Sequence, residues 1–182
     1  MIAINKTTQK TDARRAAIVE RLADHVLAHG LVAASLRPLA KAAATSDRML
    51  LYYFSDKTEI IAATLQHIAE RIVAMLSTRT APEPLPLGEL ITHLSSVVLD
   101  DQFWPYMCVW LELASRSGRG DPLYEPIAMQ IGSGFLAWGE AQLACPDPAS
   151  RPRDAARLLV TIEGMVLVKA IGMGETVERS LS

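Results

Sequence analysis

The chain has 182 residues, half of them hydrophobic, with a formal net charge of −2 and two cysteines. This length can bury a substantial core, and two cysteines exclude a disulfide framework. The first 15 residues are polar and basic, and the uncharged run 126–139 has only 14 residues. We therefore expect no secretory signal, no membrane span and a cytoplasmic location.

The first predicted element is an amphipathic helix over residues 12–29. Ile18, Leu22 and Val26 recur at helical spacing on one side, and Gly30 is a natural stop.

Two short helices joined by a tight turn are predicted over residues 35–54. Ser35 is placed to cap the first helix, Pro38 lies in its first turn, and residues 44–46 form the connection. Helices this short bury little surface alone, so they need a third helix behind them. Such a unit presents one helix to a partner, and the best-known partner is the DNA major groove.

The same stretch resembles the DNA-binding region of the TetR (tetracycline-repressor) family of bacterial regulators. That family has Ser or Thr, then an L-Y-x-x-F segment, then a lysine three residues on; here the matching positions are Ser46, residues 50–54 and Lys57. Leu51 stands where the family usually has an aromatic residue, and we expect it to face inward. Ala44 stands where the family usually has glycine, which implies a turn that does not need a positive φ.

A long helix is predicted over residues 57–77, with Asp56 and Glu59 as its capping box. Three prolines within residues 82–86 break the pattern and mark the clearest linker. Further helices are predicted over 87–99, 104–115, about 123–144 and 152–171, the last one ended by Gly172 and Gly174. With the resemblance, this pattern predicts an all-α fold with an N-terminal three-helix helix-turn-helix DNA-binding domain (1–57) and a C-terminal helical ligand-binding and dimerisation domain (58–182).

The net charge differs between the two predicted domains. Residues 1–57 carry a net charge of +4, and the remainder carries −6. A basic N-terminal third is typical of a module that faces nucleic acid, although such an excess alone is also ordinary surface. The predicted DNA contacts are Arg37, Thr45, Ser46, Arg48, Met49, Tyr52, Tyr53 and Lys57. Of these, we expect Arg48, Met49 and Tyr52 near base edges, and Arg37 and Lys57 on phosphates.

Aromatic and methionine side chains gather in the C-terminal part, which holds all three tryptophans. Such a set is core by default, yet large flat apolar side chains also line small-molecule pockets. Glu163 lies among apolar residues, so it has a partner, contacts a ligand, or is exposed by a rotation of its helix. The predicted ligand contacts are His67, Trp104, Met107, Trp110 and Glu163.

Glycines in the last two helices suggest self-association. Gly132, Gly134 and Gly139 each weaken a helix by about 1 kcal/mol relative to alanine, and they persist most readily where another backbone comes close. Residues 158–169, which contain Gly164, resemble the final helix of the TetR family. The resemblance implies a homodimer joined by the last two helices of each subunit. Alternatively, the glycines relieve crowding within one subunit.

The sequence does not predict an enzyme. It contains no phosphate-cradling glycine-rich loop and no G-x-S-x-G elbow. The two cysteines and the four histidines have no zinc-site spacing, so we expect no metal and no cofactor.

The resemblance therefore implies a transcriptional regulator, in that family most often a repressor. We expect it to bind a near-palindromic operator in double-stranded DNA as a homodimer, and to be released by a small apolar or amphipathic effector. The alternative is an effector-free helical module of the same fold that binds DNA or protein. Neither reading involves a membrane.

Overall fold

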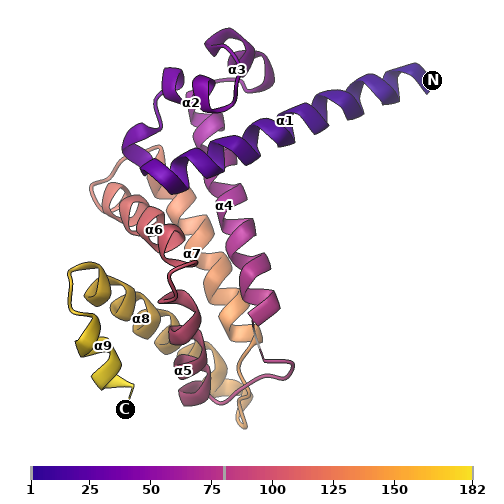
Figure 1. The fold of residues 1–182 in the computed structure, drawn as a ribbon. Coiled ribbons are helices and arrows are strands. Elements are labelled where there is room, and N and C mark those ends of the chain that lie inside the picture. The colour runs from indigo at the N-terminus through magenta and orange to yellow at the C-terminus, as the bar shows by residue number, and fades with distance from the viewer. Residues whose placement is uncertain (1, 80, 182) are drawn as a thin grey trace. The chain divides into compact units, whose positions relative to one another are not determined.

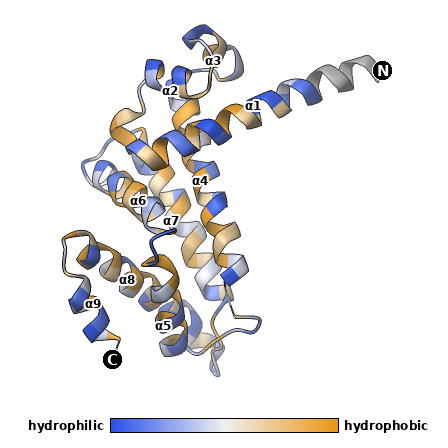
Figure 2. Cartoon of the chain, viewed as in Figure 1, coloured by the Kyte–Doolittle hydropathy of each residue, from blue (hydrophilic) through white to orange (hydrophobic). Residues whose placement is uncertain are grey.

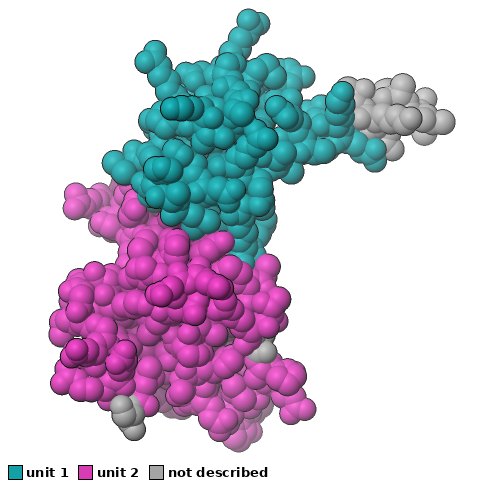
Figure 3. Space-filling model, in the orientation of Figure 1, with its two compact units in different colours: residues 1–71 teal, residues 72–182 magenta. Residues whose placement is uncertain are grey.

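The computed structural model describes residues 2–79 and 81–181, and the side chains from residue 9 onward. Within these residues the chain is all-α, with one isolated bridge between Leu85 and Leu143 (Figure 1). The predicted fold class is confirmed. The chain forms two compact units, residues 1–71 and 72–182, which we describe separately (Figure 3).

Unit 1 is a helical domain around the short helices α2 and α3. Its elements are α1 (Ile2–His29), η1 (Leu31–Ala33), α2 (Leu36–Ala42), α3 (Asp47–Tyr53) and the first part of α4 (Lys57–Arg79). Apolar and polar residues alternate around α1 and α4, as expected of helices with one buried side (Figure 2). The core includes Ile18, Leu22, Val26, Leu39, Leu50, Phe54, Ile60, Ile61 and Leu65.

Helix α1 is longer than the apolar pattern predicted. It begins at Ile2 rather than at Asp12. The segment before residue 12 has no proline or glycine to stop a helix, so the backbone continues ahead of the apolar stripe.

The helix caps hold the turns around α3 in place. Ser46 Oγ accepts a hydrogen bond from the Met49 N–H at 3.2 Å, which caps α3. The predicted cap of α4 is present, since Asp56 Oδ1 accepts from the Glu59 N–H at 2.8 Å. The Glu59 carboxylate accepts in turn from the Ser55 N–H at 2.6 Å. Ser35 occupies the N-cap position of α2 without a side-chain bond.

Unit 2 is a bundle around α8. Its elements are the end of α4, α5 (Leu87–Val98), α6 (Trp104–Ser117), α7 (Tyr124–Ala141), η2 (Pro148–Ser150), α8 (Arg151–Ala170) and α9 (Gly174–Ser180). Helix α8 packs against α5, α6, α7 and α9. Helix α9 was not predicted, because Gly174 was taken to end a helix and instead begins one; Gly172, at φ +85°, makes the turn before it.

Helix α7 ends at Ala141, three residues before the predicted end. The linker explains the difference. The Leu85 N–H donates to the Gln142 carbonyl at 3.0 Å, and the Ala144 N–H donates to the Leu85 carbonyl at 2.9 Å. These backbone groups are bonded to residue 85 and cannot extend the helix.

Helix α4 is a core helix of both units. Among the described residues it is the one helix long and apolar enough to cross a bilayer by length and composition. Its apolar residues Ile60, Ile61, Leu65, Ile68, Ile72 and Leu76 are each at most 5% exposed, so its hydrophobicity is used in packing.

The glycines of α7 and α8 have different surroundings. Gly139 is buried, and a Cβ there would lie 3.1 Å from Leu158 Cδ2 of the same subunit. Gly139 therefore relieves crowding within one subunit, which is the alternative that the sequence left open for these glycines. Gly134 and Gly164 are exposed and have open space where a Cβ would lie.

The turn between α2 and α3 differs from the expectation for Ala44. Its φ is +50°, the one positive value among described residues other than glycine. The Thr45 N–H donates to the Ala40 carbonyl at 2.9 Å, which closes a Schellman-type end of α2. That geometry needs a left-handed residue just after the helix, so alanine is strained where the TetR family usually has glycine.

We expect Ala44→Gly to raise the free energy of unfolding by about 1 kcal/mol, because glycine adopts this φ without a Cβ clash. Urea unfolding measures the change. The control is Ala42→Gly, inside α2, which should lower stability by about the same amount through lost helix propensity. If Ala44→Gly is no more stable than the parent, the backbone at residue 44 is not strained.

Candidate functional site

Helix α3 presents large side chains away from the core of unit 1. Leu50 and Phe54 are 0% and 2% exposed and anchor the helix. Tyr52 is 70% exposed and Met49 is 39% exposed, and Arg48 is exposed beside them. Exposed apolar side chains of this size on one short helix indicate a contact surface.

Leu51 belongs to this surface. We expected it to face inward, but it is 46% exposed. Successive residues of a helix are about 100° apart, and Leu50 and Phe54 already occupy the inward side, so residue 51 turns outward. Sequence reasoning missed this residue, although the spacing of Leu50 and Phe54 contained the signal.

The other predicted DNA contacts lie around α3. Arg37 and Lys57 are exposed, Thr45 and Tyr53 are half-buried, and the Tyr53 ring lies edge-on to Tyr52 at 5.1 Å between centroids. Ser46 is exposed, and its hydroxyl also caps α3. All eight predicted DNA contacts are therefore on or next to α2 and α3, at the surface of unit 1.

A shallow basic hollow between α1 and α2 was not predicted. It is lined by His25, His29, Arg37, Pro38, Lys41 and Ala42. The rings of His25 and His29 stack with centroids 4.5 Å apart. The hollow places Arg37 with Lys41 on one basic surface. The spacing of four residues between Arg37 and Lys41 did not reveal the hollow, because two of its six lining residues, His25 and His29, come from α1.

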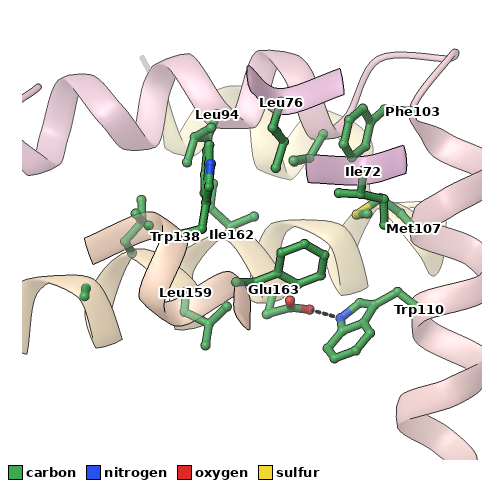
Figure 4. A pocket seen from close by; sticks show the side chains of 15 residues that line it. Ile72, Leu76, Leu94, Phe103, Met107, Trp110, Trp138, Leu159, Ile162 and Glu163 are labelled. Carbon is green, nitrogen blue, oxygen red and sulfur yellow. Dashed lines mark hydrogen bonds between the residues drawn. The ribbon is translucent and has the colours of Figure 1, made fainter. Parts of the chain in front are cut away.

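Unit 2 encloses an apolar cavity of about 70 Å³ (Figure 4). Side chains from α4, α5, α6, α7 and α8 surround it. Its lining comprises Ile72, Leu76, Leu94, Val98, Phe103, Met107, Trp110, Phe135, Trp138, Gly139, Ala155, Leu158, Leu159, Ile162 and Glu163. Glu163 is the one ionisable group in this set.

The Glu163 carboxylate is held by a tryptophan. The Trp110 Nε1–H donates to Glu163 Oε2 at 2.7 Å, across 53 residues of sequence. Burial raises the pKa of Glu163 above its ordinary value of 4.5, and the Trp110 hydrogen bond lowers it in part. The side chain therefore faces the cavity with a partner, rather than pointing into solvent.

Three of the five predicted ligand contacts line the cavity, namely Met107, Trp110 and Glu163. Trp104 does not line it, because its ring lies under Lys169 Nζ at 4.5 Å from the ring centroid. Phe103, Phe135 and Trp138 also line the cavity and were not predicted as contacts, although they belong to the aromatic residues that gather in the C-terminal part.

His67 does not line the cavity either. It belongs to unit 1, where its Nε2 lies 2.6 Å from Glu20 Oε2 on α1. Arg71, one turn further along α4, donates to Asp24 Oδ1 at 2.7 Å and also pairs with Glu20. The hydrogen bond from His67, followed by the Arg71 charge, lowers the pKa of Glu20. These residues clamp α4 to α1, which explains a histidine at position 67 without a ligand.

Comparisons with known proteins point to transcriptional regulators, although no protein-family model matches the chain. The chain is 23% identical over 158 residues to the HTH-type transcriptional regulator PksA of Bacillus subtilis (strain 168), covering 85% of this chain and 77% of PksA. A TetR-family transcriptional regulator from Rhodococcus sp. superposes with a TM-score of 0.74 at 16% identity, covering 92% of this chain and 94% of that one. The multidrug binding protein EbrR, solved with proflavin, superposes with a TM-score of 0.67 at 22% identity, over 92% of this chain and 95% of EbrR.

The raised pKa of Glu163 leads to a stability prediction. The folded protein binds the carboxyl proton of Glu163 more tightly than the unfolded chain does. The contribution of protonated Glu163 to the free energy of unfolding is therefore complete below about pH 4.5, and it is lost as the pH rises through the raised pKa. Glu163→Gln keeps an acceptor for Trp110 and removes the charge. We therefore expect it to raise the melting temperature at pH 7, and to raise it less at pH 4.

Thermal unfolding at both pH values measures the effect. The control is Glu125→Gln, at an exposed site on α7, for which we expect no comparable pH-dependent gain. An identical gain at pH 4 and pH 7 for the residue 163 variant would show that its carboxyl is not destabilised by burial.

Proposed function

We infer that this chain, which has the fold of the TetR-family transcriptional regulators, is a repressor that binds operator DNA through α3 and is released by a small molecule. The observation that carries the proposal is α3 itself, anchored by buried Leu50 and Phe54 and presenting Arg48, Met49 and Tyr52 outward. PksA and the Rhodococcus protein, which the chain resembles, are named as transcriptional regulators. On this proposal residues 1–57 form the DNA-binding domain, and residues 58–182 bind the effector and dimerise.

The chemistry of the α3 surface suits the major groove. A guanidinium such as Arg48 can donate two hydrogen bonds to a guanine edge, and apolar side chains such as Met49 can contact a thymine methyl group. Arg37 and Lys57 are exposed cations beside this surface and suit phosphates. Thr45, Ser46 and Tyr53 offer hydroxyl groups to the DNA backbone.

An exposed apolar stripe on α8 supports a homodimer. Val160, Leu167 and Ile171 are 71%, 54% and 65% exposed, and with exposed Gly164 they recur at helical spacing on one side. Large apolar side chains in such a row favour burial by a partner, and a second copy of α8 fits because small residue 164 permits close approach of two helices. One short reading helix recognises only a few base pairs, so a dimer on a near-palindromic operator provides useful specificity.

The cavity of unit 2 supports release by a small molecule. At about 70 Å³ it is smaller than most ligand pockets, so a ligand has to displace parts of its wall. Helix α4 contributes Ile72 and Leu76 to that wall, and Arg71, one residue earlier, belongs to the clamp on α1. We propose that a ligand shifts α4 and thereby favours a conformer whose reading helices no longer match the operator. A coupling of about 1–3 kcal/mol is enough, provided that the ligand prefers this conformer. EbrR, which shares the fold, is described as a multidrug binding protein.

DNA recognition is tested by selecting a duplex from random sequences and then comparing two variants on it. Lys57→Ala should weaken binding to all sequences alike and lower the salt slope by about 1, because it removes one phosphate contact. Arg48→Ala should instead reduce discrimination at one base pair by about 1–3 kcal/mol. Fluorescence anisotropy over a range of salt measures both. Parent-like binding by both variants would rule out α3 as the reading helix.

Dimerisation is tested with Gly164→Leu. The space around residue 164 is open within one subunit, so the variant should fold, while its side chain should keep two α8 helices apart. We expect a monomer by sedimentation at micromolar concentration, with an unchanged helical circular dichroism spectrum. Gly88→Leu, at an exposed and equally open site on α5, is the control and should remain dimeric. A parent chain that sediments as a monomer would refute the dimer.

A further inference from the structure

We propose that the cavity of unit 2 selects aromatic cations, with the ligand's positive charge against the Glu163 carboxylate and its ring against the surrounding aromatic side chains. This inference rests on the proposed function, since it names the chemical class of the molecule that fills the same cavity.

The first observation is that Glu163 has one occupied oxygen and one available oxygen. Oε2 accepts the Trp110 N–H at 2.7 Å. Within the described part of the chain, Glu163 makes no other hydrogen bond and no ion pair. The indole nitrogen only donates, so it orients the carboxylate without neutralising it. Oε1 is therefore left for a donor that enters the cavity (Figure 4).

The second observation is that the charge of Glu163 has no counterpart in the lining. None of the residues around the cavity is a lysine, arginine or histidine. Lys169, six residues further along α8, bonds to the Leu99 carbonyl instead and lies over the Trp104 ring. A carboxylate in such a place is costly when ionised, and a ligand cation would offset that cost.

The third observation concerns the walls. Phe103, Trp110, Phe135 and Trp138 supply four aromatic rings, and the rings of Trp110 and Phe135 meet edge-to-face at 6.1 Å between centroids. Aromatic faces attract cations, most strongly where water is excluded. A neutral apolar ligand would leave the negative charge of the carboxylate without a counter-charge, and an anion would be repelled by it. The small volume favours a ligand of one or two rings.

The test uses two probes of nearly the same shape. 1-Methylquinolinium carries a permanent positive charge, and 1-methylnaphthalene is neutral. Isothermal titration calorimetry on the DNA-free protein measures both affinities. We expect the cation to bind at least about tenfold more tightly, since hydrogen bonds and contacts that involve an ionised group are the stronger ones.

Two variants assign the preference to Glu163. Glu163→Gln keeps the shape and an acceptor for Trp110, so it should bind the neutral probe as the parent does and lose the preference for the cation. Glu125→Gln changes the net charge equally at an exposed site and should keep that preference. The inference is overturned if the neutral probe binds as tightly as the cation, if Glu163→Gln retains the preference, or if neither probe binds.

Operator DNA separates this inference from the proposed function. If 1-methylquinolinium binds in a Glu163-dependent manner but leaves DNA affinity unchanged, the ligand class stands and effector release fails. If 1-methylnaphthalene alone binds and releases the DNA, release stands and the ligand class is wrong.

Discussion

The burial of Leu50 and Phe54 is the constraint on which the outward surface of α3 depends. A helix of seven residues is not stable alone in water, so α3 exists only because these two side chains are held in the core of unit 1. Once they point inward, the helical repeat turns Tyr52, Met49 and Leu51 outward. The Ser46 cap and the strained turn at Ala44 then determine where the helix begins. The outward surface of α3 is thus a consequence of packing rather than of intrinsic helix propensity.

Helix α4 connects this surface to the chemistry of unit 2 through one continuous backbone. Its first half contributes core residues and the His67 and Arg71 pairs to unit 1, and its second half contributes Ile72 and Leu76 to the cavity wall. A packed helix responds to a displaced neighbour by moving as a body, because its interior offers few voids to absorb the change.

Two features of the molecule reduce its stability locally, and both lie at proposed sites. Ala44 has a left-handed backbone beside α3, and Glu163 is a carboxylate among apolar side chains. Deviations from locally favourable chemistry are expected where a protein binds its partners. The Glu163 carboxylate has the clearer rationale, since a carboxylate held by one indole N–H still has the capacity to bind a cation. For Ala44 the strain accompanies the hydrogen bonds that close the end of α2, from the Ala44 N–H to the Lys41 carbonyl and from the Thr45 N–H to the Ala40 carbonyl.

Local sequence patterns determined which segments become helices and where most of them end. The apolar repeat, the prolines of the linker and the cap at Asp56 act within a few residues, so they can be read without a fold. The limits of this reasoning appear at the N-terminal extension of α1, at α9 and at the end of α7. Helix α1 extends forward because no residue before position 12 stops a helix. Helix α9 begins at a glycine that was expected to end a helix, and α7 ends early because its last backbone groups bond to Leu85 in the linker.

The tertiary structure alone decided which side chains form the sites. Trp110 and Glu163 are separated by 53 residues, and His67 and Glu20 by 47, so no local repeat relates them. The sequence also did not determine whether Leu51 is buried and whether Gly139 lies within or between subunits, because both depend on which helices pack against their own. Composition indicated aromatic residues, glycines and a carboxylate in the C-terminal part. Only the packing of five helices showed that one tryptophan holds the carboxylate in a cavity while another lies beneath a lysine, because burial and pairing are properties of neighbours in space.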